Sequence, residues 1–209
     1  MPVESIEIPE SSADMSIAGI QHSPEAAAFI DTANERIEAF MLADQKVIEN
    51  FVTCDFHLTD QALAWITQNH LLTGNRFCEL GSGFGVVAML AAIRGMESIG
   101  IEIEEVLVQQ SAGLAEDLDI NAKFYTGSFV PRGVSDDLDL GQEINHVDTS
   151  EDDVFDEVGL AMDDFDLFFA FPWPGEHVFF EAVFETCAAD GSLLLTYQGR
   201  EGMRLVRKI

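Results

Sequence analysis

Basic side chains are scarce in this chain. Its 209 residues include 10 Lys and Arg against 38 Asp and Glu, which gives a formal net charge of −28. A field of this sign repels the phosphates of nucleic acids and anionic membranes, and it favours solubility. The charge makes a nucleic-acid partner unfavourable and favours a basic protein or a cationic small molecule. Acidity that serves solubility alone would give the same composition.

Cysteines and long apolar runs are also few. Cys54, Cys78 and Cys187 are scattered and form neither a CxxC pair nor a metal-type cluster, so we expect reduced thiols in a cytoplasmic protein and no metal site. No apolar run is long enough to cross a bilayer, and the acidic start of the chain is unlike a secretory signal. The length and the 47% hydrophobic content fit one globular domain. They do not specify its oligomeric state.

The N-terminal part predicts a tail and two helices. Residues 1–22 are polar and aperiodic, which predicts a mobile tail. A Ser-Pro N-cap signature then precedes apolar residues at helical spacing, which predicts a helix over 24–49. A second helix is predicted to begin at Thr59. We expect these helices, in residues 23–74, to pack on the core.

From residue 76 onward, strand-like and helix-like segments alternate. Strands are predicted at 76–80, 98–102, 122–125, 166–171 and 192–197, and helices at 85–94, 104–118 and 176–189. This alternation implies right-handed crossovers and a mostly parallel sheet with helices on both faces. The predicted fold class is α/β, with a three-layer, doubly wound, mostly parallel sheet in a domain over 75–209.

Two segments depart from the alternation. Residues 132–165 are rich in Asp and Glu and form an acidic insert, which is either a solvated face or a functional excursion. Apolar residues from Val154 onward predict a short helix near its end. Leu205 to Ile209 alternate weakly and predict one more strand at an edge of the sheet.

The most informative motif is a glycine loop after the first predicted strand. Gly81, Gly83 and Gly85 form GxGxG, followed by a helix-like stretch, which is where an α/β fold places a nucleotide-like ligand. Nicotinamide-binding loops use GxGxxG, and position 86 here is Val. Glu79 would repel a diphosphate but suits a sulfonium or an ammonium. Alternatively, it caps the glycine loop.

A second acid ends the next predicted strand. Glu102 lies about 20 residues after the glycine loop, where a carboxylate accepts hydrogen bonds from both hydroxyls of a ribose. Alternatively, Glu102 only favours the start of the following helix through the helix dipole.

These two motifs resemble those of the class I S-adenosylmethionine-dependent methyltransferases. Residues 79–85 resemble the first motif of that family and residues 100–102 its second, and the resemblance covers roughly residues 75–200. It implies a Rossmann-like fold with S-adenosyl-L-methionine as the cofactor. The residues it assigns to cofactor binding are Glu79, Gly81, Ser82, Gly83, Gly85, Glu102, Ile103, Gly127, Ser128, Phe129 and Phe171.

The resemblance also assigns roles within this set. Glu79 would act near the methionine ammonium and Glu102 would hold the ribose hydroxyls. Ser128 stands where the family often has an acid near adenine, and Phe129 would pack on the adenine ring. Asp55 lies where family members often place a segment over the cofactor. Because few residues follow the fifth strand, we expect a reduced C-terminal hairpin.

The acceptor site is expected after the fourth strand of this domain. Its loop reads Phe-Pro-Trp-Pro-Gly-Glu-His from Phe171 to His177, and the prolines keep its backbone extended. Trp173 offers a face for a planar or cationic guest, and Glu176 or His177 is the candidate proton acceptor. The plain alternative is that the aromatic residues pack in the core and that Glu176 and His177 open the next helix.

The predicted function is methyl transfer to an amine or hydroxyl group of a small molecule or a protein. Alignment of nucleophile, methyl and sulfur is then the main task of the protein. One alternative is a non-catalytic, cofactor-binding regulatory protein, which the atypical 171–177 loop favours. Another is an NAD-dependent oxidoreductase, which the glycine spacing disfavours.

Overall fold

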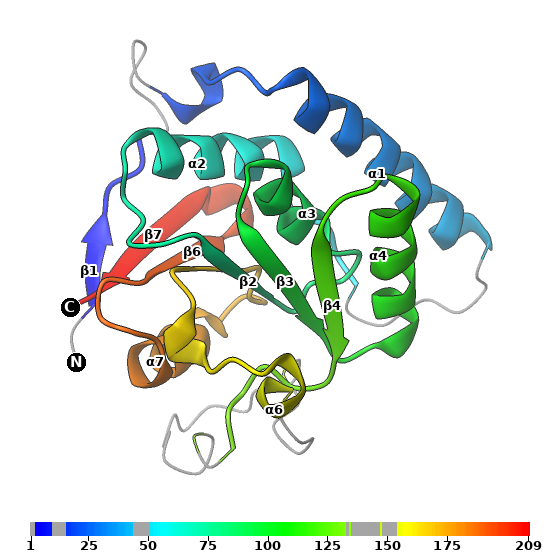
Figure 1. Ribbon diagram of the computed structural model, residues 1–209. Helices are drawn as coiled ribbons and strands as arrows, with labels where there is room; N and C mark the ends of the chain where they lie inside the picture. The colour runs from blue at the N-terminus through cyan, green and yellow to red at the C-terminus, as the bar shows by residue number, and fades with distance from the viewer. Residues whose placement is uncertain (1–2, 10–15, 44–50, 133, 135–146, 148–153) are drawn as a thin grey trace.

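The computed structural model describes residues 3–9, 16–43, 51–132, 134, 147 and 154–209 (Figure 1). Its strands are β1 (Val3–Ile6), β2 (Arg76–Leu80), β3 (Glu97–Glu102), β4 (Ala122–Thr126), β5 (Leu167–Ala170), β6 (Leu193–Tyr197) and β7 (Met203–Lys208). Its α-helices are α1 (Pro24–Ala43), α2 (Phe56–Gln68), α3 (Val86–Ile93), α4 (Glu105–Asp117), α6 (Phe155–Val158) and α7 (His177–Cys187). Short 3-10 helices are η1 (Ile17–Gly19), η2 (Met162–Asp164) and η3 (Gly199–Glu201). All of these helices are too short or too polar to cross a lipid bilayer.

The described strands form one seven-stranded sheet in the order β1-β7-β6-β5-β2-β3-β4. Strands β2 to β6 pair in parallel, and β7 runs antiparallel to both of its neighbours. From β2 the chain proceeds to β3 and β4 on one side, and it then returns to β5 and β6 on the other. The reversal between β2 and β5 makes the sheet doubly wound, as predicted.

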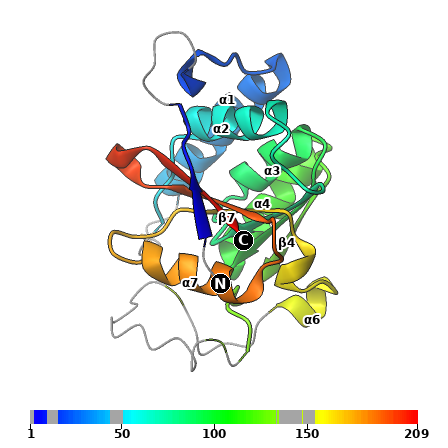
Figure 2. The same ribbon diagram turned by 90° about the vertical axis from the view of Figure 1, so that its left-hand side faces the viewer.

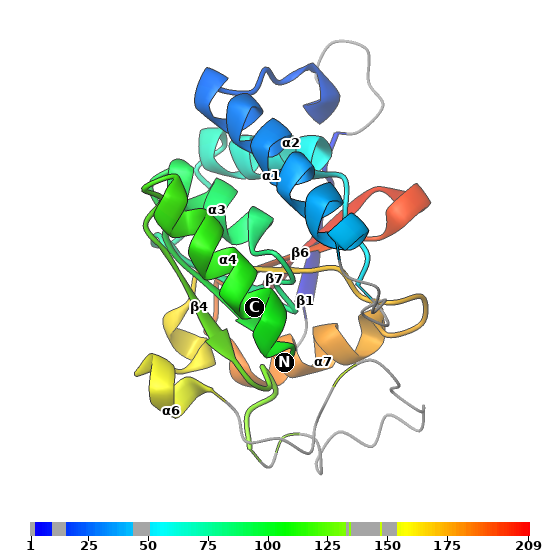
Figure 3. The same cartoon turned by 90° about the vertical axis from the view of Figure 1, so that its right-hand side faces the viewer.

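Helices cover both faces of the sheet. Helices α1 to α4 lie on one face, and α6 and α7 lie on the other (Figures 1 and 3). Adjacent strand residues alternate between the two cores: Phe169 belongs to the cluster that contains Ile30 and Leu63, whereas Phe168 belongs to the cluster that contains Val183 and Phe184. Both faces of β5 are thereby buried, which explains its uninterrupted apolar sequence.

The N-terminal segment is part of the sheet, contrary to the predicted mobile tail over residues 1–22. Strand β1 pairs antiparallel with β7, with Val3 opposite Lys208 and Ile6 opposite Leu205 (Figure 2). The sequence of β1 is polar because an edge strand buries few of its side chains, so it gave no strand signal. Its pairing partner, β7, lies at the other end of the chain. The reduced C-terminal hairpin is confirmed: β7 is the one described strand that follows β6, and β1 from the start of the chain supplies the seventh strand.

Some predicted element boundaries also change. Helix α1 ends at Ala43, and residues 44–50 of the predicted helix lie outside the described residues. Helix α2 begins at Phe56 instead of Thr59 because Asp55 caps it, accepting a hydrogen bond from the Leu58 N–H over 3.0 Å. The last strand is internal and not at the edge, because β1 covers its outer side.

The acidic insert is described only in part. Of residues 132–165, positions 133, 135–146 and 148–153 lie outside the described residues. The short helix predicted near its end is confirmed as α6.

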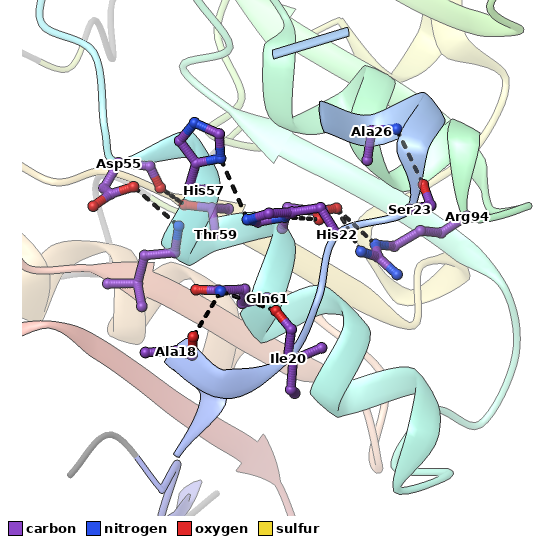
Figure 4. A network of polar contacts seen from close by, with 12 residues as sticks. Ala18, Ile20, His22, Ser23, Ala26, Asp55, His57, Thr59, Gln61 and Arg94 are labelled. Carbon is purple, nitrogen blue, oxygen red and sulfur yellow. Dashed lines mark hydrogen bonds and ion pairs between the residues drawn. The ribbon is translucent and has the colours of Figure 1, made fainter. Parts of the chain in front are cut away.

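A buried carboxylate fixes the N-terminal segment to the core. Asp60 of α2 is fully buried. It accepts hydrogen bonds from Arg94 over 2.9 and 2.6 Å, and it lies 2.6 Å from His22 Nδ1. The second nitrogen of His22 lies 3.3 Å from His57 Nδ1 (Figure 4). This network joins the segment before α1 to α2 and to the end of α3, which holds the N-terminal helices on the sheet.

Candidate functional site

A cavity of about 760 Å³ opens at the carboxyl ends of β2, β3, β5 and β6. It lies where the strand order reverses between β2 and β5. Open α/β sheets bind their ligands at such a switch point, because the loops after the strands diverge there and leave a crevice.

The cavity lining contains all but one of the predicted site residues. They are Glu79, Gly81, Ser82, Gly83, Glu102, Ile103, Gly127, Ser128, Phe129, Phe171, Trp173, Glu176 and His177. Gly85 lies outside this lining. A Cβ atom at Gly85 would stand 2.1 Å from the ring of Phe124, so this glycine makes room for packing beneath the loop.

The glycine loop turns tightly against the end of β3. The backbone N–H groups of Gly81 and Ser82 both donate to the Ile101 carbonyl oxygen over 2.9 Å. Gly81 and Gly83 have φ values of 72° and 52°, a conformation that side chains disfavour. The loop therefore presents bare backbone to the cavity.

Glu102 is held by two backbone donors. Its Oε2 accepts from the Gly83 N–H over 2.7 Å, and its Oε1 accepts from the Glu104 N–H over 3.1 Å. Burial raises the pKa of this carboxyl, and the backbone hydrogen bonds partly oppose the rise. Each oxygen keeps a lone pair, so the carboxylate can still accept from a ligand.

Glu79 lies behind the glycine loop and caps a helix. Its Oε2 accepts from the Ala88 N–H over 2.8 Å, in the first turn of α3. The cap residue of that helix, Gly85, has no side chain to do this. Burial raises the pKa of Glu79 well above its ordinary value, and the nearby Glu102 raises it further. The capping alternative is thus confirmed, while its role toward an ammonium stays a prediction.

The segment after β4 is tied to the core. Ser128 Oγ accepts from the Val130 N–H over 3.1 Å, and the ring of Phe129 stacks on Phe180 of α7 at 5.0 Å between centroids. Both residues still reach the cavity wall.

The loop after β5 forms another wall. The ring of Phe171 meets Tyr197 edge to face, with centroids 4.9 Å apart. The Glu176 N–H donates to the Trp173 carbonyl oxygen over 2.9 Å, which closes the turn before α7. Glu176 is 8% exposed, and His177, the first residue of α7, is exposed. The plain alternative that these two residues open the helix is confirmed, and both also line the cavity.

The sequence did not predict two segments that line the cavity. The one indication was Asp55, which lies where family members often place a segment over the cofactor. Residues 51–54 with Phe56 come from the approach to α2, and residues 197–201 follow β6. Phe51 packs on the glycine loop, where a Cβ atom at Gly83 would lie 2.9 Å from its ring. Burial raises the pKa of Cys54 to about 12, so its thiol is protonated at neutral pH.

Within the described ranges, no three His, Cys, Asp or Glu side chains are grouped as metal ligands.

Comparisons with known proteins identify the fold. No protein-family model and no curated protein matches the chain. A methyltransferase from Geobacter sulfurreducens superposes with a TM-score of 0.52 at 13% identity, covering 91% of this chain and 92% of its own. An RNA methyltransferase from Salinibacter ruber, in complex with S-adenosyl-L-homocysteine, gives 0.50 at 15% identity, covering 75% and 92%. The chain therefore has the Rossmann-like fold of S-adenosylmethionine-dependent methyltransferases, as predicted.

Proposed function

We propose that this protein binds S-adenosyl-L-methionine in the switch-point cavity and transfers its methyl group to an amine or hydroxyl acceptor. The observation that carries the proposal is the hydrogen bond from the Gly83 N–H to Glu102. It joins the close-approaching backbone after β2 and the carboxylate at the end of β3 in one site. A ribose needs such a carboxylate, and the attached chain needs a backbone that it can approach.

The lining supports this ligand in three respects. Its volume of about 760 Å³ lies in the range of small-molecule and cofactor sites. Glu102 keeps acceptor capacity, as described above. Gly81, Ser82 and Gly83 of the glycine loop line the cavity, so a ligand can approach this backbone closely.

Each part of the lining has a proposed task. Glu102 holds the ribose hydroxyls, and Ile103, Ser128 and Phe129 form the adenine side. Gly81 and its neighbours in the glycine loop take the methionine end. The cofactor supplies an electrophilic methyl group, so the chain must bind, orient and exclude water. Trp173, Glu176 and His177, which also line the cavity, take the acceptor side in this proposal.

Thermal unfolding with two ligands tests the proposal. S-adenosyl-L-homocysteine at about 100 times its Kd should stabilise the fold by about 2.7 kcal/mol, whereas NADH should leave the transition unchanged. Transfer of a labelled methyl group to an acceptor would then separate an enzyme from a cofactor-binding regulator. Stabilisation by NADH alone would refute the proposal and favour an oxidoreductase.

A further inference from the structure

Part of the cavity lining lies outside the residues assigned to the ribose, the adenine and the methionine end of the cofactor. It comes from three segments that are distant in the sequence: residues 51–54 with Phe56, residues 171–177 and residues 197–201. Five aromatic side chains from these segments line the cavity: Phe51, Phe56, Phe171, Trp173 and Tyr197. The edge-to-face contact of Phe171 with Tyr197 fixes two of these rings relative to each other.

Two polar groups beside these rings, the Cys54 thiol and the Tyr197 hydroxyl, are uncharged at neutral pH. Burial raises the pKa of the Cys54 thiol to about 12 and also raises that of the Tyr197 hydroxyl. The charge of Asp55 adds to the rise at Tyr197. The aromatic wall therefore carries two neutral hydrogen-bonding groups.

The charges around the cavity are mostly negative. The acidic residues of its lining are Glu79, Glu102, Glu104, Glu176 and Glu201. Among the described residues, Arg200 is the one Arg or Lys that lines the cavity. Burial favours the neutral form of Glu79 by raising its pKa, whereas Glu104, Glu201 and Arg200 are exposed to solvent. The whole chain carries −28. A guest with positive charge is attracted to this cavity, and a phosphate or carboxylate guest is repelled.

From the aromatic wall and this sign of charge, we infer that the acceptor is an amine carried on an apolar or aromatic body. The inference rests on the proposed function and narrows its acceptor class. It excludes hydroxyl groups and RNA as the preferred acceptors.

The chemistry of the step agrees with these walls. The ammonium guest first gives up a proton to water. The lone pair of the resulting neutral nitrogen then forms the new N–C bond while the C–S bond breaks, and the electron pair of the C–S bond stays on sulfur. Positive charge passes from sulfur to nitrogen, and the product is the methylated ammonium. Aromatic faces attract the charge throughout, because their ring quadrupoles favour a cation. An alcohol or phenol instead has to give up its proton to a base for the reaction to proceed.

An isosteric pair of probes tests the charge preference. Choline and 3,3-dimethyl-1-butanol have the same shape, and only choline is charged. In calorimetry on protein saturated with S-adenosyl-L-homocysteine, choline should bind at least about fivefold more tightly. Trp173→Leu should reduce this ratio, while Trp65→Leu should preserve it, since Trp65 of α2 does not line the cavity. Equal binding of the two probes would overturn the inference.

Turnover with matched acceptors gives a second readout. Labelled methyl transfer should occur to benzylamine or to a lysine-containing peptide, and these two separate a small-molecule acceptor from a protein acceptor. Benzyl alcohol, benzoate and transfer RNA should accept less than about a tenth as much label. Preferred labelling of the alcohol, the acid or the RNA would overturn the amine assignment. Failure of S-adenosyl-L-homocysteine to bind would instead refute the proposed function itself.

Discussion

The backbone N–H of Gly83 donates a 2.7 Å hydrogen bond to the carboxylate of Glu102, and both groups are buried. Glu102 ends β3, and Gly83 lies in the loop that follows the adjacent parallel strand β2, whose Leu80 pairs with Ile101. This bond fixes the carboxylate against the glycine loop before any ligand arrives. Ligand binding then requires less ordering of the site.

Gly85 allows a clear test of packing beneath the loop. Gly85→Ala should lower the free energy of unfolding by about 1–2 kcal/mol for its φ of +67° and by about 1–3 kcal/mol more for the clash with Phe124. Gly95→Ala is the matched control, with φ of +85° and open space around its Cβ position. Urea unfolding measures both. Equal losses for the two variants would refute the packing role.

Glu79 should make stability depend on pH. Its pKa is raised in the folded protein, so its contribution is fully present below its unfolded pKa of about 4.3 and is lost as the pH rises through the folded pKa. Glu79→Gln cannot ionise. The stability of this variant relative to the wild type should therefore increase with pH above about 4.3, as followed by urea unfolding.

The control for this experiment is Glu105→Gln, at the exposed start of α4. It removes a carboxyl group that solvent already surrounds, so the difference between the two variants isolates the effect of burial. A level difference for Glu79→Gln would contradict the assigned burial of that carboxyl.

The carboxylate of Asp60 should be essential for the stability of the fold and should not be needed for ligand binding in the cavity. Asp60→Asn leaves Arg94 without its charged partner, which should cost about 3–5 kcal/mol of unfolding free energy. Asp117→Asn breaks the exposed pair with Arg36 and should cost less than about 1 kcal/mol. Neither aspartate lines the cavity, so the folded variants should bind S-adenosyl-L-homocysteine like the wild type. Similar losses from the two variants would show that the network around Asp60 is not a stabilising one.

Local sequence signals predicted the parts of the site that follow single strands. The Gly81–Gly83 turn and Glu102 are such parts, because turn glycines and strand-end acids have meaning at short range. The paired strands β2 and β3 then bring them together. The capping bond of Glu79 to Ala88 was harder to assign, since an acid at that point suits either a helix terminus or a cationic ligand.

Long-range pairing explains what the sequence did not predict. Strand β1 has a polar sequence, and only β7 at the opposite end of the chain makes it a strand. Likewise, Phe51 and Tyr197 become cavity residues because the strand order brings their segments together. The local sequence around Phe51 or around Tyr197 does not indicate that either residue lines the cavity.

Calorimetry with S-adenosyl-L-homocysteine on wild type, Glu102→Ala and Glu105→Ala tests the central claim most directly. Hydrogen bonds to a charged acceptor are worth about 1.5–3 kcal/mol each, so Glu102→Ala should bind at least about tenfold more weakly. Glu105→Ala, three residues further along, should match the wild type. An unchanged affinity in a folded Glu102→Ala variant would contradict the account. So would the absence of binding to the wild type at about 1 mM ligand, which corresponds to a binding free energy weaker than about −4 kcal/mol.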